Sequence, residues 1–537
     1  MKYYFPMLIA FFLSVNAIAQ TSQLTGTVKD NEAKHVALTT VSLSEINQTV
    51  LTDEKGNYTF YNLPYGNYTV TFKMMGFEPR VISIAINKSI TTLNTTLTPE
   101  NNTLDEVEVF GVRNKQPDKL ENLTRLPLKP TEQIQSISVI SSQVIEKQGA
   151  LTITDAVRNV PGVYAFASYG NKRESMGSRG YRGIPILKNG VRVNSDFRGT
   201  GVLTDAAGID NIQVLKGVAA ITQGVATDIG SPGGVINIVT KSPKFYSGGN
   251  VSFRTGSWGF ARPQFDVYGP IDDNEKVAFR INGAYETKDS YRSLVSADRL
   301  YVNPSLAWKP NDKTTITVEM DYLDDSRTPD LGTVNLADND TYAIYDLPKS
   351  QFLGFKSDRS ITKNATYAIR LDRKINDIFS VKAAYFKSDL DVADKGASLS
   401  GMAGTNYNLK KRSYSESTRK DINEVLQLDF VAQDLMTGSI KHTFQVGMDY
   451  NRNSLNTTNG SAGVVDTLNV FSSIQHALPS ATNLGKITEV NSTSRGLGVL
   501  AQGVTTWNKY IKTFVGIRYS TVETTENKTL GVKNNDA

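Results

Sequence analysis

The sequence predicts a mainly β protein. A small β-sandwich is followed by a mixed α/β segment and then by an incomplete antiparallel β-barrel that spans a membrane. Three observations predict this fold class: an export-type leader, short β-type runs between turn residues, and a second half that alternates apolar with polar residues. After the leader, no stretch approaches the roughly 20 apolar residues of a membrane helix, so any span must be made of strands.

Composition removes several classes of function. The 537 residues include 58 Lys and Arg and 53 Asp and Glu, a net charge of +5 without a basic run, so we expect no nucleic-acid binding. With no Cys and three His, we expect no disulfide framework, no resident metal and no cofactor. No acid/base pair or nucleophile constellation is recognisable, which favours transport or binding over enzyme activity.

The first element is a leader at residues 1–19. Lys2 gives it a charged start, residues 5–15 are mostly apolar, and Ala17-Ile18-Ala19 forms a small-x-small cleavage site before Gln20. These features are typical of a secretory signal peptide, so the sequence predicts an exported protein.

Residues 22–98 are predicted to form a small β-sandwich. Four β-type runs, at 24–28, 41–43, 58–60 and 68–72, are separated by turn signals. Gly56 and Asn57 tolerate left-handed conformations, which places a reversal between the second and third runs.

Residues 99–127 read as a linker that carries one short extended segment. In residues 104–109 the valines alternate with acids, and polar and proline-containing sequence lies on both sides. Such a segment can add to the sheet edge of a partner through main-chain hydrogen bonds, or it can be an ordinary strand of the preceding sandwich.

Residues 128–243 combine a helical turn with glycine-dependent bends. Residues 153–163 form a capped turn closed by Pro161 and Gly162, and a glycine-containing turn precedes the β-branched strand that starts at Val235. The Gly177, Gly180 and Gly183 series lacks the strand-to-helix setting of a nucleotide site, so it predicts no phosphate binding.

Residues 244–537 alternate cleanly, as at 277–285 and 314–322, with aromatic residues often at the run ends. We expect strands of about ten residues, with polar loops at 323–360 and 391–418. At about 25 residues per strand and connection, this half holds eleven or twelve strands, whereas plugged transporters use ~22. The arithmetic predicts an incomplete barrel and a truncated sequence. A soluble sandwich with the same alternation is the alternative for this half alone.

Two resemblances sharpen these expectations. Residues 22–98 resemble the carboxypeptidase-regulatory-like domain, a seven-stranded transthyretin-like sandwich, through Gly26-Thr27-Val28 and the stretches 52–60 and 63–68. The chain from 104 to 270 resembles the plug and first barrel segments of TonB-dependent outer-membrane receptors. The resemblance rests on the motifs at residues 160–163, 179–181, 214–217 and 231–237, and the last motif is most similar to the ferric-siderophore branch. One departure is Lys188-Asn189-Gly190, where many members have Asp-Gly.

The resemblance implies an α/β plug domain at 128–243 inside a partial barrel at 244–537, and import of ferric siderophores across the outer membrane. It implies partners as well: TonB with its ExbB/ExbD complex, the ferric siderophore as cargo, and outer-membrane lipid. The accessory sandwich would lie in the periplasm. Import of a glycan or cobalamin, and a surface adhesion protein without transport, remain the alternatives.

The resemblance also assigns residues to three roles. The TonB box comprises Leu104, Asp105, Glu106, Val107, Glu108 and Val109. The structural residues of the plug are Arg179, Gly180, Lys216, Gly217, Gly224, Pro232, Gly233, Gly234 and Asn237. The expected siderophore contacts are Tyr164, Tyr169, Arg173, Phe197 and Arg198.

Overall fold

The structure is a computed structural model. It describes residues 21–31, 33–46, 48–75, 77–98, 121–129, 132–133, 135–168, 170–192, 204–217, 233–330, 341–403 and 406–531. The chain divides into two compact units, residues 1–109 and 110–537. The leader at 1–19 and the segment 104–109 lie outside the described residues. Over the described ranges, no helix has both the length and the apolar character needed to cross a membrane.

The first unit is a β-sandwich of two sheets around one core. Alternate residues of each strand point inward, including Leu24, Phe60 and Phe72, and these side chains pack together. One sheet has the order β4-β1-β7 with β8 also paired to β1, and the other has the order β3-β2-β5-β6. The strands are β1 (Thr21–Asp30), β2 (Thr40–Leu43), β3 (Gln48–Leu51), β4 (Asn57–Pro64), β5 (Gly66–Lys73), β6 (Arg80–Ile86), β7 (Ile90–Thr92) and β8 (Thr95–Leu97).

The sandwich has eight described strands where the resemblance implies seven. The difference comes from β7 and β8, which pair in parallel with successive parts of β1 and therefore act as one interrupted strand. At the interruption, the Leu93 carbonyl lies where a Cβ on Gly26 would be only 1.9 Å away. Asn94 fills the gap in the ladder by accepting a hydrogen bond from the Thr27 amide at 2.9 Å.

The second unit begins with an α/β segment, hereafter the plug. Its five-stranded sheet has the order β14-β13-β16-β15-β9, and a smaller sheet has the order β10-β11-β12. Two short helices are capped by Ser141 and Thr152 and pack aliphatic residues against the larger sheet. The elements are α2 (Glu121–Thr124), β9 (Ser136–Ser141), α3 (Ser142–Lys147), α4 (Ile153–Val157), β10 (Val163–Ala167), β11 (Ser175–Ser178), β12 (Tyr181–Arg182), β13 (Ile186–Lys188), β14 (Val191–Arg192), η3 (Ala206–Gly208), β15 (Ile209–Lys216) and β16 (Val235–Thr240).

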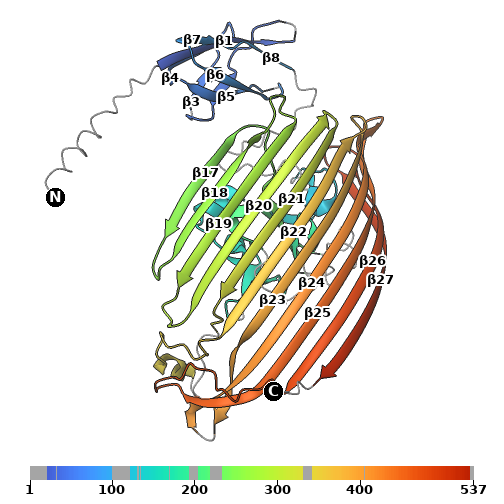
Figure 1. Cartoon of the computed structure of the whole chain (residues 1–537). Helices are drawn as coiled ribbons and strands as arrows, with labels where there is room; N and C mark the ends of the chain where they lie inside the picture. The colour runs from blue at the N-terminus through green and yellow to red at the C-terminus, as the bar shows by residue number, and fades with distance from the viewer. Residues whose placement is uncertain are drawn as a thin grey trace, which may run out of the picture. The chain divides into compact units, whose positions relative to one another are not determined.

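The rest of the unit is a single antiparallel sheet of eleven strands, hereafter the wall. Figure 1 shows the plug, in cyan, behind the tilted strands of the wall. Among the described strands, β17 and β27 each pair with one neighbour and form the two ends of an open sheet. The strands are β17 (Gly248–Thr255), β18 (Ala261–Pro270), β19 (Val277–Asp289), β20 (Ser296–Asn311), β21 (Thr314–Arg327), β22 (Arg359–Lys374), β23 (Phe379–Ala403), β24 (Asn406–Thr437), β25 (Ile440–Asn469), β26 (Lys486–Thr506) and β27 (Lys512–Gly531).

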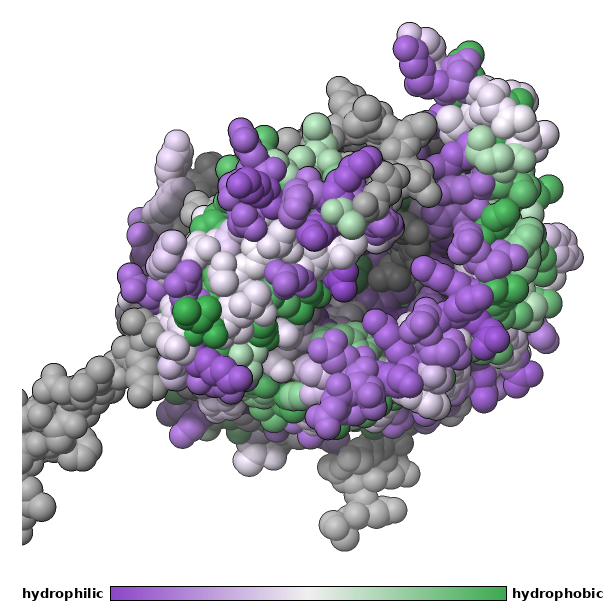
Figure 2. Space-filling view, turned by 90° about the horizontal axis from the view of Figure 1, so that it is seen from above, coloured by the Kyte–Doolittle hydropathy of each residue, from purple (hydrophilic) through white to green (hydrophobic). Residues whose placement is uncertain are grey.

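The wall is apolar outside and polar inside. On β19 the polar residues Arg280 and Asn282 are buried, whereas Tyr285 is exposed. On β25 the apolar residues Val446 and Met448 are exposed. On the right of Figure 2, hydrophilic side chains line the hollow and hydrophobic ones gather on the outer wall. This arrangement is the reverse of a soluble sandwich and is typical of a membrane barrel. The mainly β fold class predicted from the sequence is confirmed.

Two details of the predicted wall are wrong. The strands have 8 to 32 residues instead of about ten. Residues 391–403 and 406–418 are not loop, because they belong to β23 and β24 and pair in register, for example Asp391 with Lys420. The predicted loop at 323–360 also begins inside β21 and ends inside β22. Polar composition suggested loops, but backbone hydrogen bonds extend a hairpin whatever its side chains are.

The connections differ between the two rims of the wall. At one rim, the short-turn rim, strands are joined by residues 312–313, 375–378 and 438–439. At the other, the long-connection rim, they are joined by segments that include 328–358 and 470–485. This asymmetry gives the wall a direction, against which the plug residues can be placed.

Candidate functional site

Buried ion pairs hold the plug against the wall, and the first group centres on Asp205, just before η3. Its carboxylate accepts hydrogen bonds from Arg262 on β18 at 3.1 Å and from Arg299 on β20 at 3.3 Å. The same side chain caps η3 through the Ala207 amide at 2.8 Å. Burial disfavours the charged form of Asp205, but the two guanidinium groups outweigh that effect and hold its pKa below its ordinary value.

The second group lies at the hairpin of β13 and β14, where the sequence departs from the family pattern. Lys188 forms a buried ion pair with Asp321 on β21, and Asp321 also accepts a hydrogen bond from Tyr301 at 3.3 Å. Asn189 adopts a left-handed φ of 50°, and Asn237 accepts a hydrogen bond from the Gly190 amide at 2.7 Å. Lys188 therefore supplies a cation that binds the wall, and Asn237 supports the turn.

The third group is Arg125, between α2 and the plug sheet. Its guanidinium reaches Asp429 on β24 at 2.5 Å and Asp449 on β25 at 2.8 Å. Next to it, Gln502 on β26 donates a hydrogen bond to the Thr124 carbonyl at 2.8 Å. The first described residues of the plug are thus attached to β24–β26, whereas Asp205 and Lys188 are attached to β18–β21.

Two of the predicted structural glycines, Gly217 and Gly234, have a left-handed backbone conformation. Gly217 has φ 120° and Gly234 has φ 96°, and a Cβ on Gly234 would lie 1.9 Å from the Leu215 carbonyl oxygen. A Cβ on Gly233 would lie 2.9 Å from Ile184. Lys216 ends β15. Gly224 and Pro232 lie outside the described residues.

One face of the plug presents exposed aromatic and cationic groups. Tyr164 and Phe166 on β10 are 42% and 38% exposed, and Tyr181 on β12 is 48% exposed. Arg182 lies over the Phe166 ring at 5.5 Å. The turn between β11 and β12 is made by Arg179 and Gly180, with φ of 52° and 83°. We name Tyr164, Phe166 and Arg182 the aromatic face; Tyr181 pairs with Ser178, so its side chain lies on the other side of this sheet.

Tyr164 of this face was among the siderophore contacts expected from the sequence, and Phe166 and Arg182 were not. The alternation of aromatic residues in β10 and the Arg179-Gly180 turn were the signals available for finding them. Tyr169, Phe197 and Arg198 lie outside the described residues.

The loop between β10 and β11 is tied to the long-connection rim. Arg327, at the end of β21, donates a hydrogen bond to the Asn171 carbonyl at 2.7 Å, and Lys172 pairs with Asp394 on β23 at 3.3 Å. The Arg173 amide donates to the Ser168 carbonyl at 3.1 Å, which closes the loop on itself. Arg173 is therefore placed toward this rim.

At the same rim, Arg412 on β24 joins two connections. Its guanidinium pairs with Asp466 and donates hydrogen bonds to the Leu353 carbonyl at 3.2 Å and the Gln475 carbonyl at 2.8 Å. It also lies 3.8 Å from the centroid of the Phe355 ring. This buried arginine fastens residues 353–355 to Gln475.

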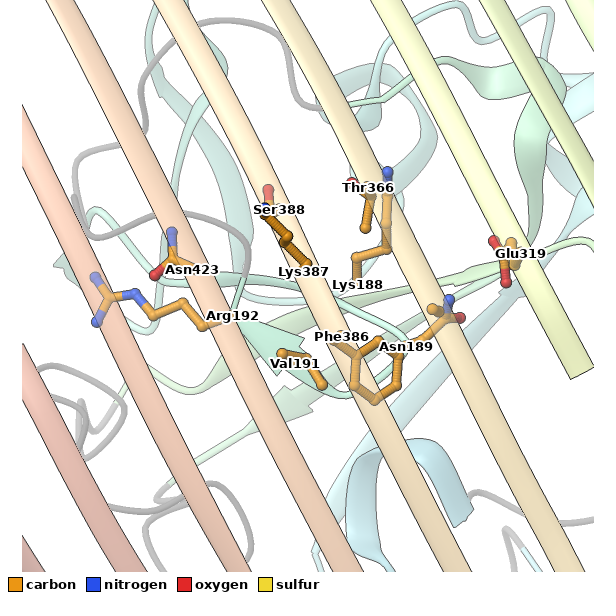
Figure 3. A pocket seen from close by; sticks show the side chains of 11 residues that line it. Lys188, Asn189, Val191, Arg192, Glu319, Thr366, Phe386, Lys387, Ser388 and Asn423 are labelled. Atoms are coloured by element: carbon orange, nitrogen blue, oxygen red, sulfur yellow. The ribbon is translucent and has the colours of Figure 1, made fainter.

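A narrow pocket separates the β13–β14 hairpin from the wall. In Figure 3, Val191 and Arg192 of the plug lie beside Phe386 and Asn423 of the wall strands. No group of three His, Asp or Glu able to hold a metal ion occurs among the residues that the structure covers.

Comparisons with known proteins agree with this geometry. A model of the CarboxypepD_reg-like domain matches residues 24–109, and a model of the TonB-dependent Receptor Plug Domain matches residues 129–235. The metal-pseudopaline receptor CntO of Pseudomonas aeruginosa is 27% identical over 342 residues, which are 64% of this chain and 47% of that protein. The ferrioxamine B receptor of Salmonella typhimurium is 28% identical over 413 residues, 74% of this chain and 56% of that protein.

Solved structures share the fold. One, of the FpvAI–pyocin S2 complex, gives a TM-score of 0.68 at 20% identity and covers 82% of this chain and 59% of that one. Another, of the ferric-catecholate import receptor Fiu from E. coli K12 in an open form, gives a TM-score of 0.60 at 21% identity. It covers 77% of this chain and 69% of that one. The chain spans about half the length of the relatives that it matches.

Proposed function

We propose that the chain is a TonB-dependent receptor that imports ferric siderophores across the outer membrane, driven by TonB. The observation that carries the proposal is a plug that buried ion pairs hold against a wall with an apolar outer face. A solute can pass such an assembly only if the plug rearranges, and this requires an energy source. The cargo is inferred from relatives named as receptors for ferrioxamine B, ferripyoverdine and catecholate siderophores.

The aromatic face supports the choice of cargo. Exposed Tyr164, with Arg182 over Phe166, offers π and cationic contacts to a chelate. A siderophore brings its own oxygen ligands for iron, so the receptor needs no metal ligands of its own. We keep Arg173 as a predicted contact, together with Tyr169, Phe197 and Arg198.

The orientation follows from the rims. Membrane barrels have short turns on the periplasmic side and longer connections outside, so the long-connection rim and the aromatic face would meet the medium. Segment 104–109 would pair with TonB as an added strand, and ExbB/ExbD would supply the energy from the inner membrane. The sandwich would then be periplasmic, and the protein acts as a transporter and not as an enzyme.

Uptake by cells tests the proposal. The chain is expressed in a Gram-negative strain without its own siderophore receptors, and binding and uptake of radio-iron-labelled ferrioxamine B are measured. Val107→Pro should abolish uptake and leave binding unchanged, since proline cannot donate to a ladder. Asn114→Pro in the same linker is the control and should leave both unchanged.

Three results would contradict the proposal. Uptake of a glycan or cobalamin in place of the ferric chelate would refute the cargo. Equal uptake by the Val107→Pro variant would refute the coupling to TonB. Cell adhesion without any chelate binding would favour the surface protein.

A further inference from the structure

Three cavities between the plug and the wall follow β22 and β23. The first lies beside Thr366 and Phe386 and has a volume of about 10 Å³, the size of one water. The second lies beside Arg370 and Ala384 and has about 250 Å³, and the third, of about 430 Å³, lies beside Ser380.

These cavities lie in a row, and neighbouring cavities share lining residues. The first and second share Asn189 and Phe386 in their linings, and the second and third share Asp372 and Lys382. From the first cavity to the third, the lining residues of β22 and β23 lie closer and closer to the 375–378 turn. The row therefore leads from the plug hairpin to the short-turn rim. Figure 3 shows its narrow first cavity, where the β13–β14 hairpin faces the wall.

The lining of the row suits a hydrated, charged solute. Arg370, Asp372 and Lys382 line the second cavity, and Arg373 and Lys374 line the third. Charged walls of both signs favour a polar solute over a lipid chain, which would gain nothing by leaving an apolar environment.

Elsewhere, the boundary between the plug and the wall is either filled by side chains or hollowed next to the end strands of the described sheet. Along β19–β21, Tyr301 is fully buried, and a Cβ on Gly208 would lie 2.0 Å from its hydroxyl oxygen. Two further cavities lie against β17 and β27, the end strands of the described sheet, and the one at β27 shares Val191, Arg192 and Asn423 with the first cavity of the row. The row along β22 and β23 is away from both end strands.

The segment 125–127 closes the row on the short-turn side. Arg125 lines the second cavity and Pro127 lines the third. Arg125 is held there by Asp429 and Asp449, and Leu126 and Leu128 pack on Val504. With Thr124, Arg125 makes the first described wall contact after segment 104–109, so a pull on that segment reaches this clasp before it reaches Asp205 or Lys188.

We propose that the row along β22 and β23 is the route of the cargo, and that Arg125 is the clasp that keeps it closed. The route rests on the proposed function, because it assumes import. The clasp does not, since it concerns only which part of the plug boundary opens when the Arg125 ion pairs are lost.

The clasp is tested by thiol labelling, because the chain contains no cysteine. Ala384→Cys places a thiol in the row, and Ala284→Cys places one on β19 against the packed part of the plug. Each is made alone, with Arg125→Gln and with Asp429→Asn, and the rate of reaction with a water-soluble maleimide is measured on the purified full chain. Arg125→Gln and Asp429→Asn should each raise the labelling rate of Ala384→Cys on the order of tenfold. Each should change the labelling rate of Ala284→Cys by less than about twofold, because local opening exposes only the segment that was held.

Two results would overturn the clasp. Unchanged labelling of Ala384→Cys would mean that Arg125 closes nothing. An equal rise in the labelling rate of Ala284→Cys would mean that Arg125 holds the whole plug or that the variant is misfolded. Asp429→Asn removes the same ion pair from the wall side, so it repeats the test without altering the plug.

The route is tested by uptake of ferrioxamine B before and after a bulky maleimide is attached. Modification of Ala384→Cys should stop uptake, and modification of Ala284→Cys should not. Continued uptake after complete modification of Ala384→Cys would refute the route alone. Absence of uptake in every unmodified variant would refute the proposed function, and the labelling result on the clasp would stand independently.

Discussion

Replacing Asp205 by Asn removes the charge that joins the plug to two strands of the wall and keeps the shape of the side chain. The amide oxygen can still cap η3, because the Ala207 amide needs only an acceptor. Arg262 keeps its ion pair with Glu286 at 2.9 Å, and Arg299 keeps the one with Asp325 at 2.8 Å. The perturbation is therefore confined to the plug–wall attachment.

The expected size follows from these remaining contacts. Removing one partner of a buried ion pair costs about 3 to 5 kcal/mol, because a charge is left uncompensated. Both arginines retain an acidic partner, so the cost should be near the lower limit, about 3 kcal/mol. At about 1.4 kcal/mol per factor of ten, the open state of the plug should become on the order of 100 times more populated.

Hydrogen exchange measures that population directly. The amides of β15 and β16 flank this attachment, and their exchange should accelerate on the order of 100-fold in Asp205→Asn under conditions where exchange reports the open population. Asp210→Asn makes the same chemical change on β15, where the Asp210 carboxylate accepts a hydrogen bond from neighbouring Asn211, and it should change exchange less than about threefold. Equal exchange in wild type and Asp205→Asn, or equal acceleration in both variants, would refute the reasoning.

Three further predictions concern the backbone bend at Gly234, the long-connection rim and the dependence of plug opening on pH. Gly234→Ala should lower the free energy of unfolding by at least about 2 kcal/mol, because of its positive φ and the close carbonyl, while Gly485→Ala, with nothing within 4 Å, should leave the melting temperature unchanged. Arg412→Gln should speed proteolysis within 347–358 on the order of tenfold, because it releases the carbonyls held there, and an unchanged cleavage pattern would exclude a fastening role. Because the pKa of Asp205 is lowered in the folded state, its stabilisation is present above the ordinary value of 3.8 and is lost as the pH falls through the folded pKa, so acid should accelerate exchange of β15 in wild type more than in Asp205→Asn.

The amount of fold that could be predicted depended on how local its cause was. Alternation of apolar and polar residues at 277–285 predicts a strand because side chains of a strand alternate between two faces. The same pattern does not say which face is buried, and on β19 the buried face is the polar one, with Arg280 and Asn282. Where polar residues predominate, at 391–418, local reasoning predicted a loop, and pairing with neighbouring strands produced a hairpin.

The candidate site divides in the same way. Gly217 and Gly234 could be found from sequence, because a left-handed backbone conformation is a property of the residue itself. Arg125 could not, because its partners Asp429 and Asp449 lie 304 and 324 residues away and are ordinary acids in a long alternating run. Phe166 and Arg182 were missed because their exposure depends on how the two plug sheets are placed.

By itself the sequence predicted export, and it determined that the chain is mainly β, divided into a sandwich, a plug and a wall, and similar to the TonB-dependent receptors. These features rest on composition, turn chemistry and the two-residue period of strands, which act over a few residues. Only the tertiary structure decided which charges join plug to wall, which rim carries the aromatic face and where a row of cavities runs. Those depend on register between elements hundreds of residues apart, and a buried charge is stabilised only by the partner that the whole fold brings to it.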